Sequence, residues 1–190
     1  SELVTASYRA SFFNPNDFTS HRVALATARA GNVVGGGDWA KDRLIPDVLA
    51  ALERNQSVNI RHPQAVRPWQ HVLEPLSGYL CLASQLSVNT SLHGESFNFG
   101  PLEENEITVE ILTQKFISNW NSCNSKVILD DNENLPESKT LRLDSTKAKK
   151  ILNWEPLMDI DNTIKETALW FKKFYSEDDI YDFTIKQINK

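Results

Sequence analysis

The spacing of apolar residues predicts a chain of helices separated by short extended segments. Apolar positions recur at the three- and four-residue intervals of a helix in five stretches. The longest of these, 72–86, is strongly periodic, and we expect it to be a buried helix. Two shorter helices are expected at 145–153 and after residue 179. The five stretches are residues 2–13, 44–52, 72–86, 108–120 and 161–174.

The extended segments are few and short. Residues 22–30 form an apolar run with β-branched members, which predicts a buried strand that ends at Asn32. Alternating or apolar runs at 57–61, 95–99 and 126–129 predict further short strands, and 132–139 reads as a polar turn. This pattern indicates a mixed α/β fold with too few strands for a doubly wound sheet of its own.

A glycine-rich turn follows the first predicted strand. Gly35, Gly36 and Gly37 are consecutive, and glycine permits backbone conformations that other residues resist. Asn32 would lie at a strand's carboxyl end, where open α/β sheets bind ligands. An ordinary strand with a flexible loop would show the same pattern. The spacing is not that of the dinucleotide-binding G-x-G-x-x-G motif, which the chain lacks.

Composition narrows the class of protein. The chain has 190 residues, of which 41% are hydrophobic and 24% charged, as in one globular domain. The net charge of −5 argues against nucleic acid as a partner, and no apolar run approaches the length of a membrane span. Cys81 and Cys123 lack metal-ligand spacing, so we expect no metal site and a reduced, cytoplasmic protein. A helix that begins at residue 2 without a capping sequence suggests a piece of a longer protein.

Three arginines lie close in sequence to the glycine turn. Arg43, Arg61 and Arg67 carry guanidinium groups, which bind phosphate oxygens through two parallel hydrogen bonds. Each could equally be a surface residue paired with a carboxylate. For Arg67, which is followed by Pro68 and Trp69, we favour an anionic ligand.

The remaining candidate groups favour structural roles. Trp69 is assigned to the core, while Trp39 is left open between packing and stacking on a ligand. His71 has no adjacent Ser or Cys that would make a nucleophile–base pair, so a hydrogen-bonded structural histidine is the better interpretation. The acidic pairs at 130–131 and 178–179 fall in polar turns and are expected to be solvated.

Taken together, the motifs resemble the C-terminal half of the CDP-glucose 4,6-dehydratases, a branch of the extended short-chain dehydrogenase/reductase family in the NAD(P)-binding Rossmann superfamily. The run RPWQHVLEP, residues 67–75, is the most specific to this branch. The motifs that carry the resemblance are AGNVVGGGDWA (30–40), DRLIPD (42–47), RHPQAVRPWQHVLEPLSGYL (61–80), NFGP (98–101), LDSTKA (143–148) and LNWEP (152–156).

The resemblance implies a lyase that uses NAD to convert CDP-glucose into its 4-keto-6-deoxy derivative, in dideoxysugar, O-antigen and lipopolysaccharide synthesis. It places the substrate diphosphate near Asn32 and Arg67. It places the nicotinamide near Val33. The nucleotide is expected to contact Arg43 and Leu44, and its base Asn59 and Arg61.

Two features of the family pattern are missing from the chain. These are the dinucleotide-binding Rossmann half and the Tyr-x-x-x-Lys motif that transfers the proton. Residues 1–190 are therefore expected to be the nucleotide-sugar-binding portion, with 1–35 containing the last helix and strand of the Rossmann half. We expect that missing half as a partner, a homo-oligomer as in the family, and no catalytic residue here. An NAD-dependent epimerase of the same fold and a non-catalytic sugar-nucleotide-binding module are the alternatives.

Overall fold

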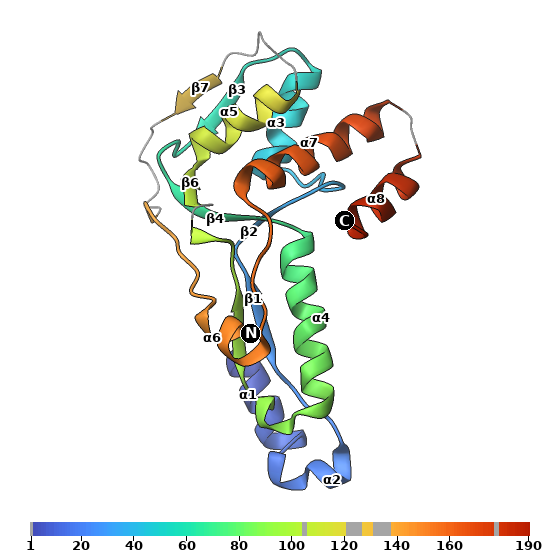
Figure 1. Ribbon diagram of the computed structural model, residues 1–190. Helices are drawn as coiled ribbons and strands as arrows, with labels where there is room; N and C mark the ends of the chain where they lie inside the picture. Colours follow the sequence, from blue (N-terminus) through green and yellow to red (C-terminus); the bar gives the residue numbers. More distant parts are fainter. Residues whose placement is uncertain (1, 104–105, 121–126, 131–137, 177–178) are drawn as a thin grey trace.

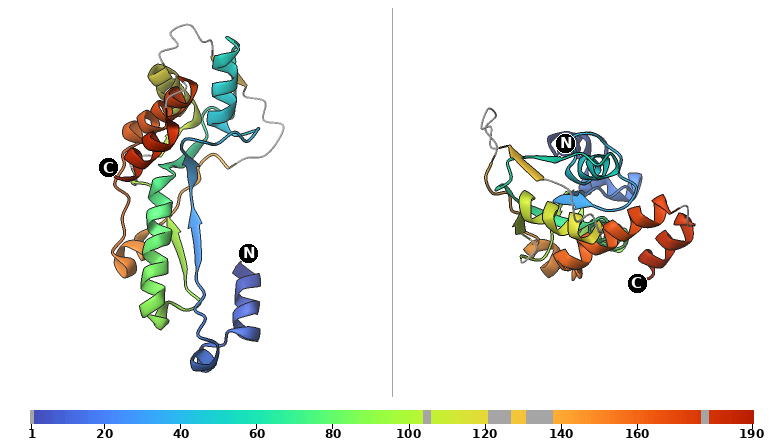
Figure 2. Two further views of the ribbon diagram at one scale, coloured as in Figure 1. Left: turned by 90° about the vertical axis from the view of Figure 1, so that its right-hand side faces the viewer. Right: turned by 90° about the horizontal axis from the view of Figure 1, so that it is seen from above.

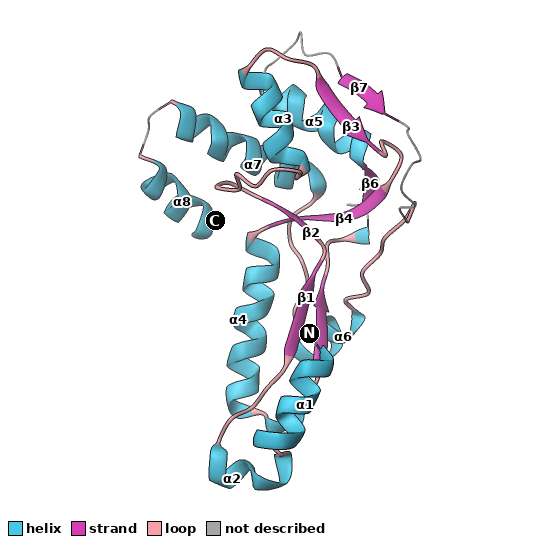
Figure 3. Ribbon diagram, turned by 180° about the vertical axis from the view of Figure 1, so that it is seen from behind, coloured by secondary structure: helices cyan, strands magenta, loops and turns pink. Residues whose placement is uncertain are grey.

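The structure, a computed structural model, describes residues 2–103, 106–120, 127–130, 138–176 and 179–190. These residues form an elongated molecule with an upper and a lower part (Figure 1). The lower part contains α1, α2, α4, α6, β1 and β5, and the upper part contains α3, α5, α7, α8, β3 and β7. The strands β2 and β4 cross between the two parts, as seen from behind in Figure 3.

The predicted helices are present with small shifts at their ends. Thr108 caps the helix after it, because its Oγ1 accepts a hydrogen bond from the Ile111 N–H at 3.2 Å. A short helix after Pro15 was not predicted. The helices are α1 (Glu2–Phe12), α2 (Phe18–His21), α3 (Leu44–Glu53), α4 (Leu73–Val88), α5 (Val109–Trp120), α6 (Thr146–Leu152), α7 (Ile160–Tyr175) and α8 (Ile180–Ile188).

The strands form three small sheets rather than one, which confirms the mixed α/β prediction. The described sheets have the orders β1-β5, β2-β4-β6 and β3-β7, and all pairs are parallel except β4 with β6. The strands are β1 (Thr27–Ala30), β2 (Asn32–Val34), β3 (Val58–Arg61), β4 (Val66–His71), β5 (Ser96–Phe99), β6 (Glu106–Thr108) and β7 (Val127–Asp130).

The prediction of one buried strand over 22–30 that ends at Asn32 is wrong. The strand β1 covers only Thr27–Ala30, and Asn32 begins a second strand, β2. The chain changes partner at Gly31, from β5 to β4, and a Cβ on Gly31 would lie 2.6 Å from the Pro68 carbonyl oxygen. Ala28 and Arg29 are exposed, because in the described part of the chain β1 is hydrogen-bonded to β5 alone.

The helix α4 is buried on one face only, where a fully buried helix was expected. Its inner face carries Gly78, where a Cβ would lie 2.2 Å from the Phe99 ring, so helix and strand approach as closely as possible. Its outer face leaves Leu76 and Leu80 exposed, at 46% and 73%. The helices α4 and α1 flank β1 on opposite sides in the side view of Figure 2.

Two hydrophobic clusters stabilise the two parts. The upper cluster packs α3, α5 and α7 over the sheets, with Leu49, Phe116 and Phe171 at its centre. The lower cluster packs α4 and α6 on β5, with Phe97, Phe99 and Trp154 at its centre. Cys81 is half-buried beside the lower cluster, as expected of a small apolar side chain.

Of the acidic residues expected in polar turns, Asp130 instead ends the strand β7, while Asp179 is exposed in the loop before α8. Asp179 caps α8 by accepting hydrogen bonds from the N–H groups of Tyr181 and Asp182 at 3.0 and 3.2 Å. Residues 131–137 and 177–178, which hold most of the predicted polar turn and parts of both acidic pairs, lie outside the described residues.

Candidate functional site

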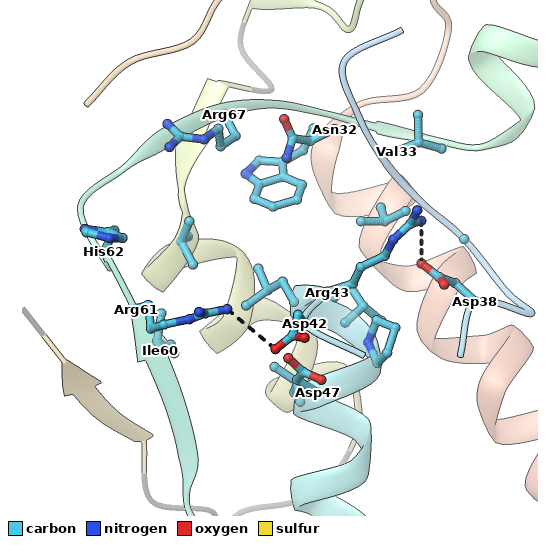
Figure 4. Close-up of a pocket in the computed structure, with 18 of the residues that line it drawn as sticks. Asn32, Val33, Asp38, Asp42, Arg43, Asp47, Ile60, Arg61, His62 and Arg67 are labelled. Atoms are coloured by element: carbon cyan, nitrogen blue, oxygen red, sulfur yellow. Dashed lines mark hydrogen bonds and ion pairs between the residues drawn. The ribbon is translucent and has the colours of Figure 1, made fainter. Parts of the chain in front are cut away.

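A cavity of about 1040 Å³ lies where β2, β3 and β4 meet the loop that leads into α3. Its volume suits a ligand larger than a single sugar, since pockets for drug-sized molecules span about 300–1,000 Å³. All seven residues for which a ligand contact was predicted line this one cavity, although they lie on four segments of the chain (Figure 4). They are Asn32, Val33, Arg43, Leu44, Asn59, Arg61 and Arg67.

The strands set the positions of the polar side chains. Asn32 is paired with Trp69 in the parallel register of β2 with β4, which brings Asn32 and the Arg67 strand to the same wall. On β3, Val58 and Ile60 are buried while Asn59 and Arg61 are exposed, as the alternation of a strand requires. Asn59 and Arg61 therefore share the face that lines the cavity.

The glycine turn is held against α7 by aromatic side chains. A Cβ on Gly36 would lie 2.0 Å from the Trp170 ring, so only glycine fits beside that indole. Trp39 packs on Phe171 and Phe174 with ring centroids 5.2 and 5.0 Å apart. Trp39, whose role was left open, is therefore a packing residue that anchors the loop and does not line the cavity.

Two of the three arginines pair with aspartates of the same loop. Arg43 Nη1 donates a hydrogen bond to Asp38 Oδ2 at 3.1 Å, and Arg61 Nη2 lies 3.9 Å from Asp42 Oδ1 (Figure 4). The surface-pair alternative thus describes both arginines. The sequence prediction missed Asp38 and Asp42, although their place in DWAKDR beside an arginine was the available signal.

Arg67 differs from the other two because it is buried. Only 7% of the residue is exposed, and its Nη1 donates a hydrogen bond to the Val66 carbonyl at 2.8 Å. A guanidinium keeps its charge when buried, so Arg67 brings a permanent positive charge to the cavity wall. Trp69 beside it is 5% exposed and its Nε1 donates to the Ile107 carbonyl at 3.2 Å, which confirms its assignment to the core.

His71 is buried at the carboxyl end of β4. Its Nδ1 accepts a hydrogen bond from the Leu73 N–H at 3.3 Å, which confirms the expected structural histidine. Burial lowers the pKa of His71 to about 4, and the charge of Glu166 opposes that shift only in part. The ring is therefore neutral at pH 7.

The part of the chain that the structure describes contains neither a metal-binding cluster nor a membrane-spanning helix. In the described ranges, no three His, Cys, Asp or Glu side chains gather where they could hold a metal ion. Of the helices that the structure describes, none combines the length and the apolar character needed to cross a membrane.

Sequence comparison finds related enzymes of nucleotide-sugar chemistry. The CDP-glucose 4,6-dehydratase of Salmonella typhimurium is 44% identical over 189 residues, which are 99% of this chain and 52% of that protein. The UDP-glucose 4-epimerase of Mycoplasma pneumoniae is 23% identical over 165 residues, 78% of this chain and 45% of that protein. The chain spans about half the length of these relatives. No protein-family profile matches.

Solved structures of similar fold are enzymes of the same kind. A dTDP-glucose 4,6-dehydratase of Streptomyces venezuelae, with NAD bound, superposes with a TM-score of 0.72 at 19% identity, over 92% of this chain and 49% of that one. The chain shares the fold of about half the length of these dehydratase chains. A UDP-glucuronic acid 4-epimerase of Bacillus cereus gives a TM-score of 0.72 at 15% identity, over 92% of this chain and 50% of that one. The resemblance predicted from the motifs is confirmed.

The lowered pKa of His71 predicts how stability depends on pH. An unfolded histidine, with a pKa of 6.5, binds a proton well before folded His71 does at about 4. The free energy of unfolding should therefore fall as the pH drops from about 6.5 to about 4, by roughly 3 kcal/mol from this residue. Urea denaturation across this range measures it.

The variant His71→Asn keeps an acceptor for the Leu73 N–H and removes the titrating group, so its stability should fall less over the same range. His62→Asn is the matched control, since His62 is half-exposed with a φ of 49° that asparagine tolerates. Parallel pH profiles for wild type and His71→Asn would contradict this account.

Proposed function

We propose that this chain is the substrate-binding portion of an NAD-dependent CDP-glucose 4,6-dehydratase. The observation that carries the proposal is the 44% identity to the Salmonella enzyme, which extends over 99% of the chain and hence over the whole cavity. The cavity has the size and the guanidinium groups that a nucleotide sugar requires.

The proposed contacts follow the chemistry of the cavity wall. Arg67, buried and permanently charged, is assigned to the diphosphate together with Asn32. Arg43 and Leu44, at the start of α3, are assigned to the nucleotide. Asn59 and Arg61, on one face of β3, are assigned to its base. A diphosphate would replace the carboxylates that pair with Arg43 and Arg61, and surface pairs of that kind contribute only about 0–1 kcal/mol.

In this proposal the chain binds and orients the sugar, and NAD supplies the redox chemistry when bound: the C4 hydroxyl is oxidised, water leaves across C5 and C6, and the hydride returns to C6. Among the described residues Val33, an apolar side chain beside Asn32 on the cavity wall, is the one assigned to the nicotinamide. The residues that hold the rest of NAD and that transfer protons are assigned to a Rossmann half of the same protein, against which residues 1–35 would pack.

A second candidate is an NAD-dependent epimerase that acts on another nucleotide sugar. It is favoured by the structural likeness to the UDP-glucuronic acid 4-epimerase at a TM-score of 0.72. The 44% identity to the dehydratase against 23% to the UDP-glucose 4-epimerase favours dehydration. A cytoplasmic location stays a prediction of the composition, and a role in O-antigen and lipopolysaccharide synthesis stays a prediction of the resemblance.

Product analysis tests the proposed function. The protein at its natural length, supplied with NAD, should convert CDP-glucose into the 4-keto-6-deoxy sugar, whose carbonyl is detectable by mass spectrometry and by its absorbance in alkali. The 190-residue chain alone should not, because the proton-transfer motif is missing from it. Recovery of a C4 epimer would establish the epimerase instead, and turnover by the 190-residue chain would contradict the division of roles.

Arg67 is the residue whose loss should weaken substrate binding most clearly. In the protein at its natural length, Arg67→Lys keeps the charge but loses the two parallel donors, so binding should weaken by about 1.5–3 kcal/mol. Because the diphosphate is remote from the reacting C4 to C6 atoms, much of the loss should appear in KM. Steady-state kinetics with CDP-glucose measures both constants.

The matched control for this substitution is Arg142→Lys. Arg142 is largely exposed, pairs with Glu106 at 2.8 Å and lies outside the cavity. Its substitution should leave KM within the error of the wild-type value. A thermal melt of each variant separates the two explanations: if KM rises only in step with a falling melting temperature, Arg67 is a structural residue.

We also propose that a second copy of the protein covers the apolar outer surface of the lower part. The helix α1 has no buried residue and exposes Leu3 at 88%, while α4 exposes Leu80 at 73%. Light scattering of the protein at its natural length should give the mass of a dimer, and Leu80→Glu should shift it toward the monomer. Ser118→Glu, exposed on α5 in the upper part, tests whether any added charge has this effect. A wild-type monomer would assign these surfaces to the rest of the same protein.

A further inference from the structure

The base that a nucleotide carries is distinguished by the order of donors and acceptors along its edge. Cytosine presents the N4 amino donor beside the N3 acceptor. Uracil and thymine present the O4 acceptor beside the N3–H donor. In the same register, a site that offers an acceptor next to a donor pairs with both atoms of cytosine and with neither atom of uracil. Cytosine therefore makes two hydrogen bonds that uracil does not make there.

Asp42 and Arg61 place such an acceptor and donor side by side on the cavity wall. Asp42 lies in the loop before α3, Arg61 ends β3, and Asp42 Oδ1 is 3.9 Å from Arg61 Nη2 (Figure 4). That separation is longer than a hydrogen bond, so neither group is saturated by the other. Both side chains are open to the cavity and to solvent, at 87% and 67% exposed.

The other arginine–aspartate pair of the loop is built differently. Asp38 accepts a hydrogen bond from Arg43 at 3.1 Å and another from the Ala40 N–H at 3.1 Å, and only 28% of its side chain is exposed. Its carboxylate is thus engaged in holding the loop. Of the two pairs, the one formed by Asp42 and Arg61 keeps a carboxylate and a guanidinium available to the edge of a base.

We propose that Asp42 and Arg61 together read the edge of the base and select cytosine over uracil. This rests on the proposed function, which puts the base beside Arg61 but assigns no role to Asp42. The Asp42 carboxylate accepts a hydrogen bond from the N4 amino group, and the Arg61 guanidinium donates to N3. Aspartate accepting from cytosine N4 is the pairing that proteins use on cytosine in nucleic acids.

Calorimetric titration of the holoenzyme at its natural length with CDP and with UDP tests this assignment. Wild type should bind CDP roughly 5- to 150-fold more tightly than UDP, the range expected for a well-paired base contact. Asp42→Asn should bring that ratio close to one, because an amide can turn either its oxygen or its NH2 group toward the base. The φ of Asp42 is 63°, a conformation that asparagine also tolerates, so the loop should fold.

Asp38→Asn is the matched control, because it removes the same negative charge from the same loop. It should alter the affinities for CDP and UDP by a common factor and leave their ratio at the wild-type value. A wild-type ratio near one, or a ratio unchanged by Asp42→Asn, would overturn the base-reading assignment while leaving the proposed function standing. Failure of wild type to bind either nucleotide would overturn both.

Discussion

The pairing of β2 with β4 is the constraint on which both the cores and the cavity depend. Val34 on β2 and Trp69 on β4 belong to the upper hydrophobic cluster. Gln70, the neighbour of Trp69, is 1% exposed and donates from Nε2 to the Phe99 carbonyl at 2.9 Å, which ties the same strand to the lower cluster. A strand that is anchored in two cores cannot move without disturbing both. Asn32 and Arg67, which lie on these strands and line the cavity, are therefore held in fixed positions.

Charge in this molecule is balanced locally rather than over the whole chain. The net charge is −5, yet the cavity wall carries three arginines, matched by Asp38, Asp42 and Asp47. Exposed ion pairs contribute little to stability and exchange easily with an incoming anion. The burial of Arg67 has a different effect, because a charge near a low-dielectric wall interacts more strongly with a ligand. The cavity therefore combines two arginines whose carboxylate partners an anionic ligand can replace with one arginine that is buried.

Local sequence patterns predicted most of the helices but little of the strand pairing. The helical spacing of apolar residues predicted α3, α5 and α7, since the buried face of an amphipathic helix is formed by residues of one continuous segment. The strands β4 and β6 were missed because their pairing joins residues about 40 apart, as in Arg67 with Ile107. Pro68 inside β4 is also atypical of a strand, since proline cannot donate to a ladder.

The candidate ligand residues were predicted from side-chain chemistry and the resemblance, and the structure brings them around one cavity. The roles of Asp38 and Asp42 were not predicted, because sequence alone does not show which charged side chains lie close together. Trp39 could not be assigned from its own segment either. Its partners Phe171 and Phe174 lie on α7, more than a hundred residues further along the chain.

Two segments of the chain, 27–34 and 66–71, change pairing partners at the same place. Residues 66–68 of β4 pair with β6, and Trp69 to His71 pair with β2, so Pro68 lies where one partner gives way to the other. The opposite strand changes partner at Gly31, whose Cα approaches the Pro68 carbonyl so closely that no side chain would fit. A residue without an N–H and a residue without a Cβ thus meet at the crossing. Asn32 and Trp69, the residues of β2 and β4 next to this crossing, line the cavity together with Asn59 and Arg61 of β3.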